Sequence, residues 1–153
     1  MKEDRFLVAI LVVIALLVAV ALGTFFLQRE NAVYLPEDTP DGVVHNYILA
    51  LAQEDYERAY NYLADEEYKP DYETFVSYFL TYRGGDAGYQ IGEVREISDT
   101  MAYVELTVMD GGGAPFGERY SYAEQARLVK EEGEWKIIEM PYAFWDWAWY
   151  QEE

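Results

Sequence analysis

The feature that most constrains this chain is an uncharged, apolar run near its amino terminus. From Phe6 to Leu27 the chain has 22 residues without a charged side chain. A helix of that length spans about 33 Å, which is enough to cross the hydrocarbon core of a bilayer. The sequence therefore predicts a transmembrane anchor at 6–27, preceded by a short cytoplasmic segment at 1–5.

A cleaved signal peptide is the alternative interpretation of this run, because basic residues precede it and residues 19–21 form a small-x-small pattern. The apolar residues continue past that pattern to Leu27, which favours an uncleaved anchor. After Arg29 the next basic residue is Arg58. This distribution of Lys and Arg places the amino terminus in the cytoplasm and predicts a single-pass protein of the cell membrane with an extracytoplasmic carboxy-terminal domain.

The remainder of the chain is very acidic. Positions 1–30 hold three of the 11 basic and three of the 29 acidic residues, so positions 31–153 carry 8 against 26, a net charge of −18. Such a field repels nucleic acid and anionic lipid and favours cations and basic partners, so we exclude nucleic-acid binding. The chain has no cysteine, which rules out disulfides, thiolate metal sites and thiol nucleophiles.

Helical periodicity dominates the first half of the acidic region. Residues 31–38 follow neither the helical nor the strand period, and residues 28–38 are interpreted as a linker. Thr39 is a candidate helix cap with a proline at the first helical position, and apolar residues then recur at helical spacing to about Ala52. Similar apolar stripes predict a second helix over 56–63 and a third over 72–80.

The period then changes to that of strands. Residues 100–109 alternate apolar and polar side chains, which predicts a strand with one buried face. Neighbouring stretches predict three more strands, at 89–97, 119–130 and 134–140, with a turn at Glu131-Glu132-Gly133. Three helices followed by about four antiparallel strands predict one α+β domain.

Three short motifs in residues 39–142 connect this pattern to a known fold. They are Thr39-Pro40-Asp41-Gly42-Val43-Val44, Asp55-Tyr56-Glu57-Arg58-Ala59-Tyr60 and Gly133-Glu134-Trp135-Lys136-Ile137-Ile138. With them the chain resembles the nuclear transport factor two-like superfamily of cone-shaped folds, which includes ketosteroid isomerase and scytalone dehydratase, in a membrane-anchored bacterial form. The resemblance implies a curved antiparallel sheet wrapped over the helices around a cavity, which relatives use for catalysis or binding, or fill with side chains.

We predict no catalytic, cofactor-binding or metal site. A ketosteroid isomerase mechanism uses a carboxylate that moves a proton and a phenol that holds an oxyanion, but no position here matches that motif. His45 is the only histidine, which excludes a multi-histidine site, and we interpret it as a surface or half-buried residue. The acidic turns at 65–67 and 131–134 lack the alternating-ligand spacing of a calcium loop.

The tail at 143–153 and the residue before it are unusually aromatic. Six rings lie within nine positions, and they belong to Tyr142, Phe144, Trp145, Trp147, Trp149 and Tyr150. One interpretation folds them over the domain's own cone, sealing its cavity. A second exposes them as an anchor for a protein partner. A third, a membrane-interface belt, is weakened by the neighbouring acidic residues.

The absence of a recognisable site favours a membrane-anchored extracytoplasmic binding or assembly module without catalytic activity. Two alternatives remain open. One is a small-molecule isomerase or dehydratase-type enzyme that uses the cone cavity, and the other is a structural accessory subunit of a membrane complex. We expect the lipid bilayer to hold the amino-terminal helix, and we expect a protein partner or a second copy of the chain, with no cofactor.

Overall fold

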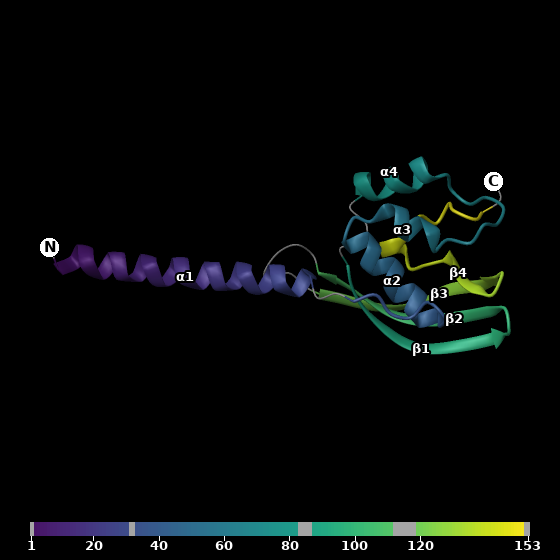
Figure 1. The fold of residues 1–153 in the computed structure, drawn as a ribbon, viewed down its shortest axis with the longest axis horizontal. Coiled ribbons are helices and arrows are strands. Elements are labelled where there is room, and N and C mark those ends of the chain that lie inside the picture. The colour runs from purple at the N-terminus through teal and green to yellow at the C-terminus, as the bar shows by residue number, and fades with distance from the viewer. Residues whose placement is uncertain (1, 31–32, 83–86, 112–118, 152–153) are drawn as a thin grey trace. The chain divides into compact units, whose positions relative to one another are not determined.

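The structure of the protein is a computed structural model that divides into two compact units, Met1–Val33 and Tyr34–Glu153 (Figure 1). It describes residues 2–30, 33–82, 87–111 and 119–151, of which 2–6, 24–30, 110–111 and 119 are described by their backbone alone. The second unit contains both the predicted domain at 39–142 and the described part of the tail, so these two segments belong to one body.

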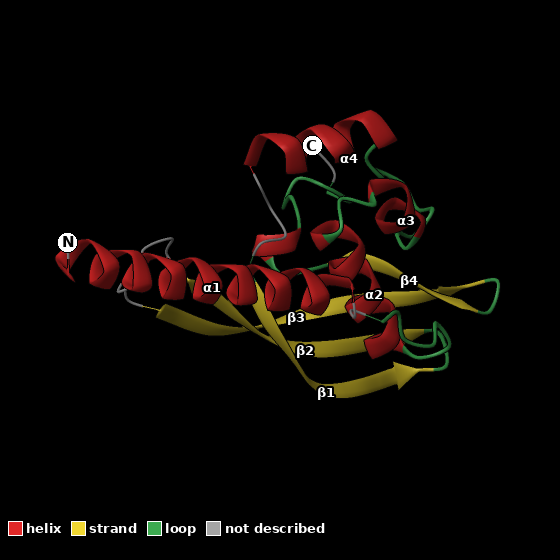
Figure 2. Ribbon diagram, turned by 60° about the vertical axis from the view of Figure 1, so that its left-hand side comes forward, coloured by secondary structure: helices red, strands yellow, loops and turns green. Residues whose placement is uncertain are grey.

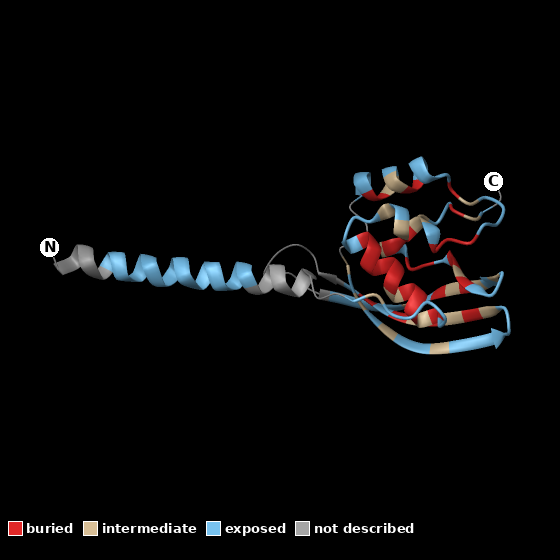
Figure 3. Ribbon diagram, viewed as in Figure 1, coloured by how far each residue is buried: buried red, intermediate tan, exposed pale blue. Residues whose placement is uncertain are grey.

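The first unit contains one helix, α1, from Lys2 to Glu30. Its described side chains, at 7–23, are all exposed (Figure 3). Within the part of the chain that the structure describes, no helix combines the length and the apolar character needed to cross a membrane. The predicted anchor at 6–27 extends past these side chains at both of its ends, into residues described by their backbone alone.

Three helices of the second unit confirm the predicted helical segments, and they are α2 (Pro40–Ala52), α3 (Tyr56–Asn61) and α4 (Tyr72–Tyr82). The predicted cap is present, because the Thr39 hydroxyl oxygen accepts a hydrogen bond from the Gly42 N–H at 3.3 Å. Ten of the 13 residues of α2 are buried (Figure 3). This helix is therefore the centre of the core.

Four strands form one antiparallel sheet in the order β1-β2-β3-β4 (Figure 2). They are β1 (Gly88–Ser98), β2 (Met101–Gly111), β3 (Arg119–Glu131) and β4 (Glu134–Glu139), and the short 3₁₀ helix η1 (Tyr142–Phe144) follows them. The turn into β4 places Gly133 at a φ of 91°, which favours glycine. The predicted α+β class and its four antiparallel strands are confirmed.

The predicted helix over 56–63 is wrong at its carboxy-terminal end. α3 stops at Asn61, and the residues that follow it pair with β4 instead. The Ile137 N–H donates to the Tyr62 carbonyl at 2.8 Å, and the Ala64 N–H donates to the Ile137 carbonyl at 2.9 Å. The backbone groups that would extend the helix are used by the sheet.

Residues 34–38, predicted as the end of a linker, belong to the second unit, and we call them the strap. The fully buried Asn46 binds both polar groups of Leu35: its side-chain oxygen accepts the N–H at 2.7 Å, and its amide donates to the carbonyl at 2.8 Å. A Cβ atom on Gly42 would lie 2.0 Å from the Pro36 carbonyl oxygen. Glycine at this position lets the strap approach α2.

Candidate functional site

The six aromatic residues singled out at the carboxy-terminal end divide into a buried and an exposed set. The buried set is Phe144, Trp145 and Trp149, with 0, 3 and 5% of their surface exposed, and Tyr150 is half-buried. The exposed set is Tyr142 and Trp147, at 67 and 75%. The same short segment therefore contributes both to the core and to the surface.

The buried set belongs to the hydrophobic core of the second unit. Tyr47 of α2 is itself buried and donates its hydroxyl hydrogen to the Phe144 carbonyl at 2.8 Å. Its ring meets that of Trp145 edge-on, with 6.4 Å between centroids. The Trp149 ring lies 5.4 Å from the Phe75 ring of α4. The buried set is thus packed into the hydrophobic core of the second unit.

Two phenols hold the backbone of the tail. The Tyr78 hydroxyl donates to the Trp145 carbonyl at 2.9 Å, and the Tyr150 hydroxyl donates to the Ala64 carbonyl. Burial raises the pKa of Tyr78 to about 12. It also raises the pKa of Tyr150, and the negative charge of Glu131 adds to that effect. Both phenols are therefore protonated donors at neutral pH.

The exposed set borders a groove of about 540 Å³, which we call the tail groove. Its aromatic lining includes the exposed Tyr142 and Trp147 together with the largely buried Trp145 and Trp149. The sheet contributes Tyr103, Glu124, Gln125 and Arg127. This volume lies in the range of sites that bind small ligands or a few residues of a peptide.

The charged side chains that line the tail groove give it an excess of negative charge. The Arg127 Nε lies 3.3 Å from a Glu139 carboxylate oxygen, an ion-pair distance. The N–H on this nitrogen is nevertheless buried and makes no hydrogen bond to the described residues. Glu124 accepts the Tyr142 backbone N–H at 3.1 Å. Because Glu139 balances Arg127, the charge of Glu124 is uncompensated among the side chains that the structure describes.

The tail groove follows an open edge of the sheet. β4 pairs with residues 127–131 of β3, and among the described residues no strand pairs with 123–126 on that side (Figure 2). Successive residues of a strand point to opposite faces of the sheet. Glu124 and Gln125 both line the tail groove, so the groove reaches around the edge of β3.

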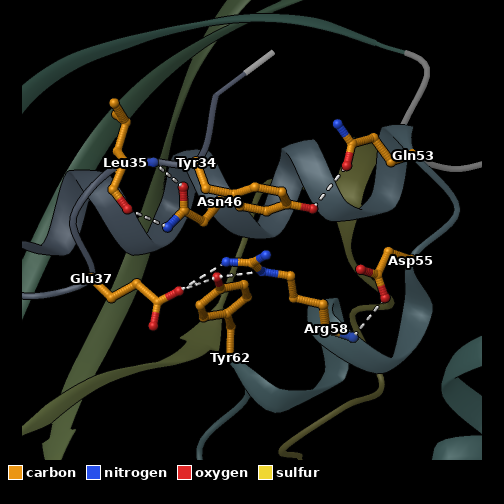
Figure 4. A network of polar contacts seen from close by, with 8 residues as sticks. All are labelled: Tyr34, Leu35, Glu37, Asn46, Gln53, Asp55, Arg58 and Tyr62. Atoms are coloured by element: carbon orange, nitrogen blue, oxygen red, sulfur yellow. Dashed lines mark hydrogen bonds and ion pairs between the residues drawn. The ribbon is translucent and has the colours of Figure 1, made fainter. Parts of the chain in front are cut away.

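A second groove, of about 460 Å³, lies beside the strap, and its polar groups bind one another (Figure 4). The Tyr62 hydroxyl donates to Glu37 at 2.7 Å, and Arg58 Nε donates to the Tyr62 oxygen at 3.1 Å. The Arg58 guanidinium lies 3.4 Å from the centre of the Tyr34 ring. Burial and the carboxylate of Glu37 raise the pKa of Tyr62. This network fastens the strap.

His45 is half-buried, as interpreted from the sequence, and it pairs with a phenol of the sheet. Its Nδ1 lies 2.9 Å from the Tyr89 hydroxyl, and burial raises the pKa of Tyr89. The Tyr89 ring in turn contacts Phe144 edge-on at 6.1 Å. Neither member of the pair is a carboxylate, so it differs from the acid and phenol that ketosteroid isomerase uses.

The two acidic turns, far apart in the sequence, meet in the structure. The two carboxylate oxygens of Glu131 each lie 3.1 Å from the backbone nitrogen of Asp65. Across the described ranges, no group of three or more His, Asp or Glu side chains is arranged to hold a metal ion. Periodicity could not reveal this contact, because the two residues are 66 positions apart.

No known protein family and no curated protein matches this sequence. Solved structures of similar fold include a SEC-C motif containing protein from Rhodopseudomonas palustris, with 17% identity, a TM-score of 0.54 and coverage of 69% of this chain and 79% of the other. A ketosteroid isomerase-like protein from Erwinia carotovora atroseptica has 17% identity, a TM-score of 0.47 and coverages of 63% and 86%. An NTF-2 like protein of unknown function from Shewanella oneidensis has 14% identity and a TM-score of 0.44, with coverage of 62% of this chain and 88% of the other. At these identities the first similarity shows the fold alone.

Proposed function

We propose that this protein is a membrane-anchored, extracytoplasmic binding or assembly module of the nuclear transport factor two-like type, without catalytic activity. One observation carries the proposal, the division of the tail. The buried set packs in the hydrophobic core of the second unit, while Trp147 and Tyr142 are exposed beside the tail groove. Exposed large aromatic residues beside a groove are typical of protein-binding sites.

The anchoring part of the proposal rests on the composition of α1. Residues 7–23 are apolar or glycine without exception and are exposed on every side of the helix. A helix that is apolar all round is stable when nonpolar surroundings cover it, because its exposure to water is unfavourable. The uncharged run from Phe6 to Leu27 and the basic residues before it support a bilayer as those surroundings.

Alkaline carbonate extraction tests the anchoring. The full-length protein is expected in the membrane pellet, and protease added outside the cytoplasmic membrane is expected to reach residues 34–153. The same residues expressed without α1 are the control and should appear in the supernatant. A soluble product of the full-length gene whose mature chain starts at Leu22 would support the signal-peptide interpretation instead.

A substitution in the exposed set tests the binding function. Trp147→Ala should change the free energy of unfolding by no more than about 0.5 kcal/mol and should reduce the size of the complex that the protein forms in gently solubilised membranes. Tyr82→Ala is the matched control, because Tyr82 is 71% exposed on α4 and does not line the tail groove. A complex of unchanged size in Trp147→Ala would argue against the proposal.

A further inference from the structure

We propose that the tail groove binds an extended, basic segment of a partner protein, which adds to the sheet as a new strand along the open edge of β3. This inference rests on the proposed function and specifies its partner by chemistry. Three features of the described residues support it: an unused strand edge, exposed aromatic rings beside that edge, and the charge of the compact unit.

The strand edge supplies backbone partners. The outer edge of a strand presents N–H and C=O groups at every second residue, and an extended peptide can pair with them. No described strand occupies that side of residues 123–126 of β3. β4 ends at Glu139, and the chain continues through Pro141, which has no N–H to donate, into η1. An added strand would therefore continue the line of β4, antiparallel to β3.

The other free edge of the sheet is a poorer template. The register of β1 against β2 shifts between Ile91 and Val94, and a bulge of this kind interrupts a regular row of hydrogen-bonding groups. The exposed charged residues Glu93, Arg95 and Glu96 lie at or next to this interruption. Charges and bulges are the features by which natural proteins discourage pairing at an edge. The contrast favours β3 as the edge that receives a partner.

The lining of the tail groove suits basic side chains. Glu124 provides the uncompensated carboxylate on one face of the sheet. Trp147 and Tyr142 provide exposed ring faces, which attract lysine and arginine. Alternate side chains of an added strand point to the same face, so a segment with Lys or Arg at every second position would direct several cations toward these groups.

The net charge decides between a basic partner and a second copy of the chain. Positions 31–153 hold 26 acidic and 8 basic residues. Two copies would therefore repel each other at the edge, whereas a basic segment is attracted and its association is accelerated. Charge complementarity thus assigns the groove to a basic partner.

Peptide titration tests the inference on the full-length protein in uncharged detergent micelles. The probe is an octapeptide of alternating lysine and valine with blocked termini. Isothermal titration calorimetry measures its binding. We expect saturable binding that weakens about tenfold or more in Trp147→Ala and in Glu124→Gln, with melting temperatures retained. The same peptide with every backbone nitrogen methylated cannot donate strand hydrogen bonds and should bind at least about tenfold more weakly. A glutamate–valine peptide should not bind.

Two results would overturn the inference. Equal binding of the N-methylated peptide would mean attraction by charge without strand addition. A lack of binding, together with a concentration-dependent dimer that Trp147→Ala abolishes, would assign the edge to a second copy. The proposed function can be separated from the inference: if complex size in membranes depends on Trp147 but the lysine–valine peptide does not bind, only the inference fails. If neither measurement depends on Trp147, both fail.

Discussion

The strap and the tail flank the core in sequence, and they are attached to it by different forces. The strap is held mainly by polar contacts, which it makes to the buried side chains of Asn46 and Tyr62 and through the exposed ion pair of Arg58 and Glu37. The tail is held mainly by the buried rings of Phe144, Trp145 and Trp149. Burial of large rings stabilises a fold by more than exposed ion pairs do. The tail is therefore part of the core, whereas the strap is an attachment to it.

Deleting residues 143–153 is expected to have the largest effect. The deletion removes three buried rings, and the loss of each typically costs about 3–5 kcal/mol, so the sum reaches the whole stability of an ordinary domain, about 5–15 kcal/mol. Thermal unfolding followed by near-ultraviolet circular dichroism should lose its cooperative transition, and an apolar-surface dye should bind. Retention of a cooperative transition near the original temperature would contradict the role of the tail in the core.

One substitution in the buried set and one in the exposed set test separately how much each set contributes to stability. Trp149→Ala is expected to lower the free energy of unfolding by about 3–5 kcal/mol, because Trp149 contacts Phe75 and Phe79 in the core. Trp147→Ala, two positions earlier on the exposed side, should change it by less than about 0.5 kcal/mol. Urea titration measures both. Equal losses in the two variants would mean that burial does not distinguish these residues.

Among substitutions that affect the strap, the largest effect is expected for Asn46 of α2, whose buried side-chain amide binds Leu35. Asn46→Ala leaves the N–H and C=O groups of Leu35 without their partner and is expected to cost about 1–3 kcal/mol. Amide hydrogen exchange should be faster at Leu35 while staying slow in β2. Gln53→Ala is the control, because Gln53 accepts an exposed hydrogen bond from Tyr34 in the same region. A similar loss of stability in both variants would mean that the burial of Asn46 does not make its hydrogen bonds more important than the exposed one of Gln53.

High pH should weaken the attachment of the tail. The pKa of Tyr78 is raised to about 12 and that of Tyr150 is also raised, so the folded state holds these protons more tightly than the unfolded state does. Their contribution to stability is complete below the ordinary tyrosine pKa, about 10, and declines as pH rises from there through the raised values. Chemical unfolding at a series of alkaline pH values should show this decline. In Tyr78→Phe the decline should be shallower, and an unchanged slope would argue against this coupling.

The smallest effect is expected at the surface of the strap. Glu37→Gln removes the ion pair with Arg58, whose two side chains are 40% and 56% exposed. Exposed pairs typically contribute no more than about 1 kcal/mol, so the melting temperature should change little. Raising the salt concentration should have almost no further effect on the variant. A loss as large as that of Asn46→Ala would mean that the strap depends on its surface charges.

Local signals predicted the elements, and long-range contacts account for what they missed. The Thr39 cap and the turn at Gly133 depend on residues close in sequence, so both could be predicted from it. The early end of α3 depends on Ile137, and the strap depends on Asn46 meeting Leu35 after α2 is in place. These contacts become visible only in three dimensions.

The open edge of β3 could have been predicted from the lengths of the predicted strands, although not from their periodicity. The strand predicted at 119–130 is longer than its partner predicted at 134–140, and two paired strands of unequal length leave part of the longer one uncovered. The lining residues Glu124, Gln125 and Arg127 lie at or next to that uncovered part. No pattern in the sequence could assign Trp147 to the surface and Trp149 to the core, because the tail follows no regular period.

The hydrogen bond between Tyr47 and Phe144 joins residues 97 positions apart and has a consequence for the order of synthesis. α2, with its ten buried residues, leaves the ribosome long before the rings that cover it. Contacts of such long range slow folding, and domains generally fold as units during synthesis. We therefore expect the newly made domain to remain sensitive to proteases until Phe144 has emerged, so that the tail sets the moment at which protection begins.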